Sequence, residues 1–172
     1  MILVGDQGFP PVDRTVVDNL RLFLRGGGTL LIDDSSGLED SAFDRSVRRL
    51  VSRLLPGQRM RPIGREHALY RSFFILRRVA GRLVVKDHLS GVWTGDITPV
   101  IYSQNDLFGA LARTRSGDWR FDVVPGGTRQ RVEARKLGVN LLLFALTGNY
   151  KLDAVHVDTL LKRMRRQGGY GR

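Results

Sequence analysis

Cysteine is absent from the 172 residues of this chain. Its absence excludes disulfide bonds, catalysis by a thiolate and metal sites with cysteine ligands. Histidine is scarce, so a histidine base or ligand is limited to His67, His88 and His156. No apolar run is long enough to span a bilayer, because the longest one, Val139–Leu146, is short and contains Asn140. No basic segment precedes the first apolar residues, and we therefore expect no signal peptide.

Lysine is also rare, because 24 of the 28 basic residues are arginine. The net charge of +11 is unevenly distributed along the chain. Residues 1–44 carry 3 basic and 8 acidic side chains, residues 45–82 carry 11 and 1, and residues 83–172 carry 14 and 8. The basic middle region offers nucleic-acid binding as one alternative, but no RNA or DNA recognition motif accompanies it. An arginine-rich composition is typical of a GC-rich genome, so we expect a solvated basic surface without a nucleic-acid partner.

Length and composition predict one soluble globular domain. The chain has 42% hydrophobic and 26% charged residues, and its length allows a core without disulfides or metals. We expect a single α/β domain over residues 1–166, followed by a flexible, glycine-rich tail over residues 167–172. As the chain stands, these features predict a cytoplasmic location.

The stretch Gly26–Gly37, with the sequence GGGTLLIDDSSG, is the clearest fold signal. Its three glycines can end a helix, and Thr29–Ile32 then forms the short apolar run of a buried parallel strand. An earlier strand at Ile2–Val4 and an amphipathic helix after Asp13 precede this stretch. Strand, helix and strand joined by short connections predict a right-handed βαβ unit, in which Ile2–Val4 pairs with Thr29–Ile32.

The remaining elements follow from apolar spacing and turn residues. We expect helices over Asp40–Leu55, Leu107–Leu111, Thr128–Leu146 and Ala154–Arg166, strands at Leu83–Val85, Thr98–Tyr102 and Trp119–Val124, and an irregular excursion over Gln58–Gly81. Thr147–Asn149 is expected to end the third helix, which is apolar on nearly all sides and should be buried. The last helix should bury Val157, Leu160, Leu161 and Met164. Together these elements predict a three-layer α/β domain, with a mostly parallel central sheet and helices on both faces.

Polar side chains follow three of the predicted strands. They are Asp6, Asp33, Asp34, Ser35, Ser103, Asn105 and Asp106. Because ligands of open α/β sheets bind outside the carboxyl ends of the strands, these residues form a candidate surface for a ligand or protein partner. Paired carboxylates can also hold Mg²⁺ or Ca²⁺, or act as acid and base. The structural alternative is that they cap helices and satisfy turn amides.

A serine hydrolase is the enzymatic alternative, with Ser35 as nucleophile and His67 as base, acting on a glycan or peptide. The G-x-S-x-G elbow is missing, because the residues here are DDSSG. Gly26–Gly28 ends a helix instead of opening one, and Gly126–Gly127, which does precede a helix, matches no phosphate-binding fingerprint. We therefore expect no P-loop activity, no metal and no cofactor. A carboxylate-dependent hydrolase remains open as a variant of the same alternative.

Several runs of the sequence resemble one bacterial family, the domain of unknown function 4159. They are GDQGFPPV, LRLFLRGGGTLLIDDSSG, FDRSVRRL, HALYRSFF, PVIYSQNDLFGA and VPGGTRQRVEARKLGVNLLLFALTGNYKLDAVH, within about residues 3–163. The resemblance implies a class I glutamine-amidotransferase-like, flavodoxin-like fold. It also implies relatives that are often exported or tethered to membranes and are encoded near ATPases and von Willebrand-type domains. It implies no particular activity.

The chain departs from this resemblance at two points. Amidotransferase-like enzymes use a Cys–His pair, whereas Ser35 and Ser36 stand here where some relatives carry cysteine. Relatives also tend to have an upstream segment, often with a signal peptide, so a shortened chain is an alternative to a native start. We therefore expect a non-catalytic binding or scaffolding module without amidotransferase activity. Its expected partner is a protein of an envelope-associated assembly, or a small polar ligand, bound by the strand-end residues.

Overall fold

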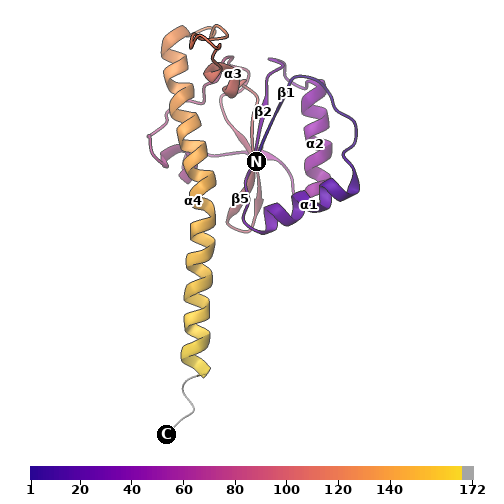
Figure 1. Ribbon diagram of the computed structural model, residues 1–172, viewed down its shortest axis with the longest axis vertical. Helices are drawn as coiled ribbons and strands as arrows, with labels where there is room; N and C mark the ends of the chain where they lie inside the picture. Colours follow the sequence, from indigo (N-terminus) through magenta and orange to yellow (C-terminus); the bar gives the residue numbers. More distant parts are fainter. Residues whose placement is uncertain (168–172) are drawn as a thin grey trace.

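The computed structural model describes the backbone of residues 1–167 and the side chains of residues 1–147. The chain forms an α/β fold around one five-stranded sheet with the spatial order β1-β2-β5-β4-β3. The strands are β1 (Ile2–Gly5), β2 (Leu30–Asp34), β3 (Arg61–Pro62), β4 (Ser90–Thr94) and β5 (Ile97–Ser103). The helices are α1 (Arg14–Arg25), α2 (Ala42–Leu54), the 3-10 turn η1 (Ala68–Arg71), α3 (Leu107–Leu111) and α4 (Gly127–Gln167). Figure 1 shows α1 and α2 on one side of the sheet and α4 on the other.

One half of the sheet is parallel and the other half is antiparallel. Strands β1, β2 and β5 are parallel neighbours, and the predicted pairing of the first two strands is confirmed. Strands β5 and β4 are antiparallel, as are β4 and β3, so the sheet is mixed and not mostly parallel. The reason is local, because only two residues separate β4 from β5 and so short a connection can join only antiparallel strands.

Two predicted strands do not form. Leu83–Val85 is irregular, because its backbone amides donate to a strand end instead of a ladder: Leu83 N donates to the Asn105 carbonyl (3.0 Å) and Val85 N to Asn105 Oδ1 (2.8 Å). In Trp119–Val124 only Trp119 pairs, through an isolated bridge to Arg113. Sequence reasoning missed two strands: β3, which lies within the predicted irregular excursion over Gln58–Gly81, and β4, which lies a few residues after Leu83–Val85.

The last helix is longer than predicted. Helix α4 runs without a break through Thr147–Asn149, so the predicted third and fourth long helices are one element. Its predicted burial on all sides is also wrong, because Leu146 is 73% exposed and Leu142 is 50% exposed. In Figure 1 the second half of α4 continues past the sheet. The predicted burial in the last helix and the predicted tail at 168–172 lie outside the described residues.

Within the described part of the chain, no helix is both long enough and apolar enough to cross a bilayer.

The hydrophobic core consists of two clusters, one on each face of the sheet. Side chains of successive strand residues point to opposite faces, so β2 and β5 contribute to both clusters. Leu31 and Ile101 pack with residues of η1, α3 and α4, whereas Leu30, Ile32 and Val100 pack with residues of α1 and α2. The predicted buried strand is confirmed, because all five residues of β2 are buried. Each such aliphatic side chain contributes ~1.5–3 kcal/mol when fully buried.

Candidate functional site at the strand ends

The candidate site lies at the carboxyl ends of the three parallel strands. Asp33 and Asp34 end β2, and Ser103 ends β5. The strand register puts Asp33 opposite Ser103 and Asp34 opposite Gly5. The structure therefore brings the polar residues of three separate sequence segments to one end of the sheet, as the sequence predicted for parallel neighbours. Their burial and partners decide what they can do there.

Asp33 is buried and holds the beginning of α3. The side chain is 1% exposed, and its two carboxylate oxygens accept hydrogen bonds from Leu107 N (3.0 Å) and Phe108 N (2.8 Å). Burial raises the pKa of Asp33 from 3.8 to about 6, although the bonds from the Phe108 and Leu107 amides lower the pKa in part. Both oxygens are thus occupied by backbone donors and none faces solvent.

Asp34 organises the loop that leads into α2. Its Oδ1 accepts from Ser36 N (2.8 Å), and its Oδ2 accepts from the hydroxyls of Ser41 (2.6 Å) and Tyr102 (3.2 Å). Burial, followed by the charges of Asp34 and Asp44, raises the pKa of Tyr102 far above its ordinary value of 10.0. The phenol therefore stays protonated and acts as a hydrogen-bond donor to Asp34.

Asn105 and Asp106 fasten the segment 82–86 to the end of β5. Asn105 Oδ1 accepts from Val85 N and Lys86 N, both at 2.8 Å, and its Nδ2 donates to the Lys86 carbonyl (2.7 Å). The buried carboxylate of Asp106 forms an ion pair with Arg82, whose side chain is partly exposed. These contacts explain why residues 83–85 do not join the sheet, since the amides of Leu83 and Val85 already donate to Asn105 at the strand end.

Two loops meet above this buried polar layer. The Glu39 carboxylate pairs with Lys86 Nζ (2.7 Å), and Gly37 lies so close to Leu83 that a Cβ at residue 37 would be 2.6 Å from Leu83 Cδ1. Leu38 and Val84, which sequence reasoning missed, stand on these loops and are 63% and 54% exposed. The available sequence signal was limited to a single apolar residue, Leu38, directly after the polar DDSSG stretch, because the exposure of both residues follows only from the structure.

Of the other sequence-predicted residues at this end, only Asp6 and Ser35 are more accessible than the buried group. Asp6 is exposed, and Ser35 is half-buried directly after β2. Ser103 is buried beside Asp33, and its side-chain hydrogen bond lowers the pKa of that carboxyl. The predicted set therefore divides into a buried layer that holds loops and two residues, Asp6 and Ser35, that solvent reaches.

Ser35 and His67 do not form a nucleophile–base pair. His67 Nε2 lies 3.0 Å from Thr98 Oγ1, near the beginning of β5, whereas Asp33, two residues before Ser35, pairs with Ser103 at the other end of β5. Thr98 and Ser103 are five positions apart along β5, which corresponds to ~17 Å. In this structure Ser35 and His67 therefore cannot act together as nucleophile and base, because the length of the sheet separates the two side chains.

The basic residues of the middle region do not gather on one surface. Helix α2 carries Arg45, Arg48, Arg49 and Arg53 on the face of the sheet that α1 shares. Arg65, in contrast, stacks on Tyr70, with 5.2 Å from the guanidinium carbon to the ring centre, and Tyr70 belongs to the core cluster of the opposite face. In the described part of the chain, moreover, no three histidine or acidic side chains are grouped so that they could hold a metal ion.

Comparison with known proteins identifies a family. The model of a domain of unknown function (DUF4159) matches residues 3–146, and the chain therefore belongs to this family. The match confirms the family that the sequence motifs indicated. A search of curated proteins finds no match to the chain.

Proposed function

We propose that this member of the DUF4159 family is a non-catalytic binding or scaffolding module. In this proposal the fold is a three-layer, flavodoxin-like relative of the class I glutamine amidotransferases that has lost the catalytic cysteine. One observation carries the proposal: the polar side chains at the strand ends hold loops in place instead of facing a substrate.

Four buried side chains each fix a different segment. Asp33 holds the start of α3, Asp34 the loop before α2, Asn105 residues 85–86, and Asp106 residue 82. Oxygen atoms that already accept backbone hydrogen bonds cannot also act as acid or base toward a substrate without breaking those bonds. Loops that are rigid before binding lose little conformational entropy when a partner binds, which favours recognition over chemistry.

The exposed residues of the same loops favour a protein partner. Leu38 and Val84 present apolar surface on two loops that touch, and the Glu39–Lys86 ion pair borders them. An apolar centre with a charged rim is the usual composition of a protein interface. In the proposal Asp6 and Ser35 contact the partner at the rim, and the buried polar residues, including Ser103, support the surface from below.

Site-specific cross-linking tests this proposal. Because the chain has no cysteine, Leu38→Cys introduces a single thiol that can carry a maleimide-linked benzophenone. Leu22→Cys is the matched control, because Leu22 is 65% exposed on α1. We expect irradiation of the purified, labelled protein in an extract of its native host to join residue 38, but not residue 22, to one specific protein. Val84→Asp in the Leu38→Cys protein should reduce that product at least about fivefold, since a charge then disrupts the apolar centre.

Two outcomes would overturn the proposal. The first is the same set of cross-linked proteins from residues 22 and 38, which would mean that neither surface is specific. The second is hydrolysis of a glycan or peptide by the purified protein that Asp33→Asn abolishes while the melting temperature is retained. That result would assign a catalytic role to the carboxylate.

A further inference from the structure

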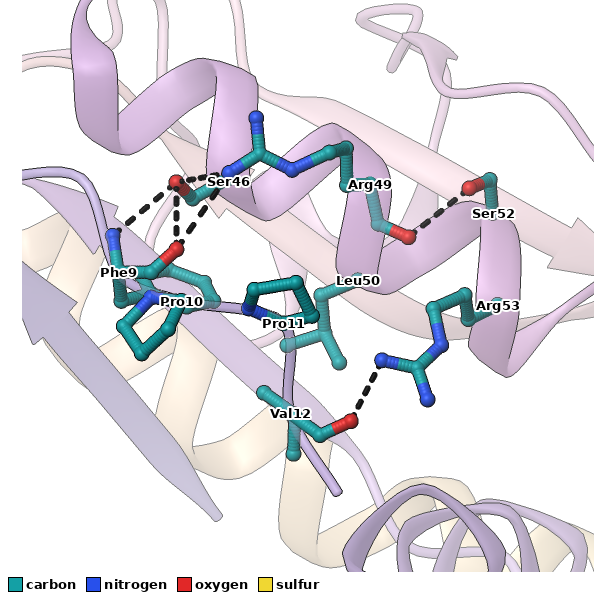
Figure 2. Close-up of a pocket in the computed structure, with 9 residues that line it drawn as sticks. All are labelled: Phe9, Pro10, Pro11, Val12, Ser46, Arg49, Leu50, Ser52 and Arg53. Carbon is teal, nitrogen blue, oxygen red and sulfur yellow. Dashed lines mark hydrogen bonds between the residues drawn. The ribbon is translucent and has the colours of Figure 1, made fainter. Parts of the chain in front are cut away.

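A pocket lies between α2 and the segment that leads from β1 to α1. Its volume is about 230 Å³. The segment Phe9–Val12 forms one side, and α2 forms the other with Ser46, Arg49, Leu50, Ser52 and Arg53 (Figure 2). In the view of Figure 2, Pro11 and Leu50 lie between the guanidinium groups of Arg49 and Arg53. The pocket therefore combines an apolar interior with two positive charges.

The walls of the pocket are fixed by hydrogen bonds between α2 and the segment. Phe9 N donates to Ser46 Oγ (3.1 Å), and Arg53 Nη1 donates to the Val12 carbonyl (2.5 Å). Arg49 Nη2 donates to Ser46 Oγ within α2 (2.8 Å) and to the Phe9 carbonyl of the segment (3.4 Å). Pro10 and Pro11 restrict the backbone between these anchors, because the proline ring fixes φ. The pocket is thus formed before any ligand binds.

Arg49 and Arg53 lack an acidic partner within residues 1–147. Arg48 on the same helix pairs with Asp44 (2.8 Å), and Arg21 pairs with Asp18 (2.8 Å), whereas no carboxylate of the described side chains lies within 4.0 Å of Arg49 or Arg53. Each guanidinium has five N–H groups and gives only some of them to the chain. Residues four positions apart share one face of a helix, so the two remaining sets of donors lie on the same side of α2.

We infer that this pocket binds an acidic segment of a protein partner. One apolar side chain of the segment enters beside Pro11 and Leu50, and flanking carboxylates pair with Arg49 and Arg53. The volume supports a single side chain, because pockets for nucleotides and other small molecules measure ~300–1,000 Å³. Guanidinium groups bind carboxylates through paired hydrogen bonds. Because no carboxylate of the described side chains pairs with Arg49 or Arg53, both groups can pair with carboxylates of a partner.

This site goes beyond the proposed function, because it lies on a different surface and does not depend on Leu38 or Val84. A titration of the isotope-labelled full chain, followed by amide chemical shifts, measures binding directly. The probe is the tripeptide acetyl-Glu-Phe-Glu-amide, and the control is its neutral counterpart acetyl-Gln-Phe-Gln-amide. We expect the acidic peptide to shift the amides of Phe9, Val12 and Ser46 and to bind at least about fivefold more tightly than the neutral one.

Variants of the protein assign the charge effect to the pocket. The double variant Arg49→Gln, Arg53→Gln should bind the acidic peptide no better than the neutral one. Arg45→Gln is the matched control, because Arg45 is exposed on α2 outside the pocket, where it donates to the Asp40 carbonyl (2.5 Å). It should retain the preference for the acidic peptide. If the double variant does not fold, two measurements still test whether the arginines select carboxylates. The unmodified chain should prefer the acidic peptide, and the single variant Arg49→Gln should reduce that preference.

Three results would overturn the inference. Equal affinity for both peptides would show that the arginines do not select carboxylates. An equal loss of affinity in Arg45→Gln would mean that the general charge of α2, and not the pocket, is responsible. Tighter binding of inorganic phosphate than of the acidic peptide, at the same amides, would assign the site to a phosphate ligand instead.

Discussion

Asn140 of α4 forms two hydrogen bonds with the backbone of Phe74. Its Oδ1 accepts from Phe74 N (2.8 Å), and its Nδ2 donates to the Phe74 carbonyl (2.8 Å) and also to the Leu69 carbonyl (2.8 Å). Asn140 is 0% exposed and sits among apolar residues of the helix. One side chain thus ties the irregular excursion after β3 to α4, with each of its hydrogen-bonding atoms occupied.

Asn140→Leu should lower the free energy of unfolding by ~2–4 kcal/mol. The leucine leaves one backbone N–H and two carbonyls buried without partners, and each such group costs ~1–3 kcal/mol, partly relieved by local relaxation. Equilibrium unfolding in urea measures the change. Asn19→Leu, at an exposed position of α1, is the control and should change the stability by less than ~0.5 kcal/mol. Equal stability of the two variants would contradict a clamping role for Asn140.

The sequence predicted the elements whose pattern is local and missed those decided by distant partners. The buried strand at Thr29–Ile32 and its pairing were predictable, because an uninterrupted apolar run fits a strand that is covered on both faces. Leu83–Val85 is also an uninterrupted apolar run, yet the amides of Leu83 and Val85 donate to Asn105, about twenty residues later, instead of to a neighbouring strand. Thr147–Asn149 resembles a helix end, but a glycine inside a helix costs only ~1 kcal/mol. That cost does not suffice to end α4 there.

The candidate site was predictable in position and not in accessibility. Strand ends and parallel pairing put Asp33 and Ser103 together, and both follow from the sequence pattern. Whether Asp33 faces solvent depends on Leu107 and Phe108, whose amides come from a turn more than seventy residues away. Sequence patterns do not contain that contact. The distance between Ser35 and His67 also depends on a contact between distant segments. His67, which precedes η1, contacts Thr98 near the beginning of β5 and not the end of β5 that lies beside Asp33.

Gly81→Ala should destabilise the fold by at least ~2 kcal/mol. A Cβ at residue 81 would lie 2.0 Å from the carbonyl oxygen of Asn105, and backbone atoms cannot move aside as a flexible side chain can. Gly138→Ala is the contrasting variant, because its Cβ would meet only the Leu111 side chain at 3.1 Å and alanine favours the helix. Thermal unfolding should show a lower melting temperature for the first variant and no loss for the second. A loss of similar size in both would contradict this explanation.

His67 should make the fold less stable at mildly acidic pH. Its Nδ1 accepts from Leu69 N (3.2 Å), and burial lowers its pKa below 6.5. Because the pKa in the folded state is below that in the unfolded state, stability is complete above pH 6.5 and is lost as pH falls through the folded pKa. His67→Asn keeps a hydrogen-bond acceptor but does not titrate, so the decline in melting temperature between pH 7.5 and 5 should be smaller. An unchanged decline would exclude His67 as its source.

Asp33 should produce a pH effect of opposite sign in a lower range. Its pKa is about 6 in the folded state and 3.8 without the fold, mainly because of burial. With the folded pKa above the unfolded one, the contribution to stability is complete below pH 3.8 and is lost as pH rises through 6. A shift of about two pKa units corresponds to ~3 kcal/mol.

Asp33→Asn separates this titration from the role of Asp33 as a hydrogen-bond acceptor. Asparagine has one acceptor oxygen for the two amides of Leu107 and Phe108, so the variant should be less stable than the unmodified chain at pH 4. Since asparagine does not titrate, the stability difference should shrink steadily between pH 4 and 7 in urea unfolding experiments. Ser103→Ala removes a bond that lowers the pKa of Asp33, and should move the pH dependence to higher pH. Parallel stability curves for the unmodified chain and Asp33→Asn across this range would show that Asp33 is already ionised at pH 4, against the effect of its burial.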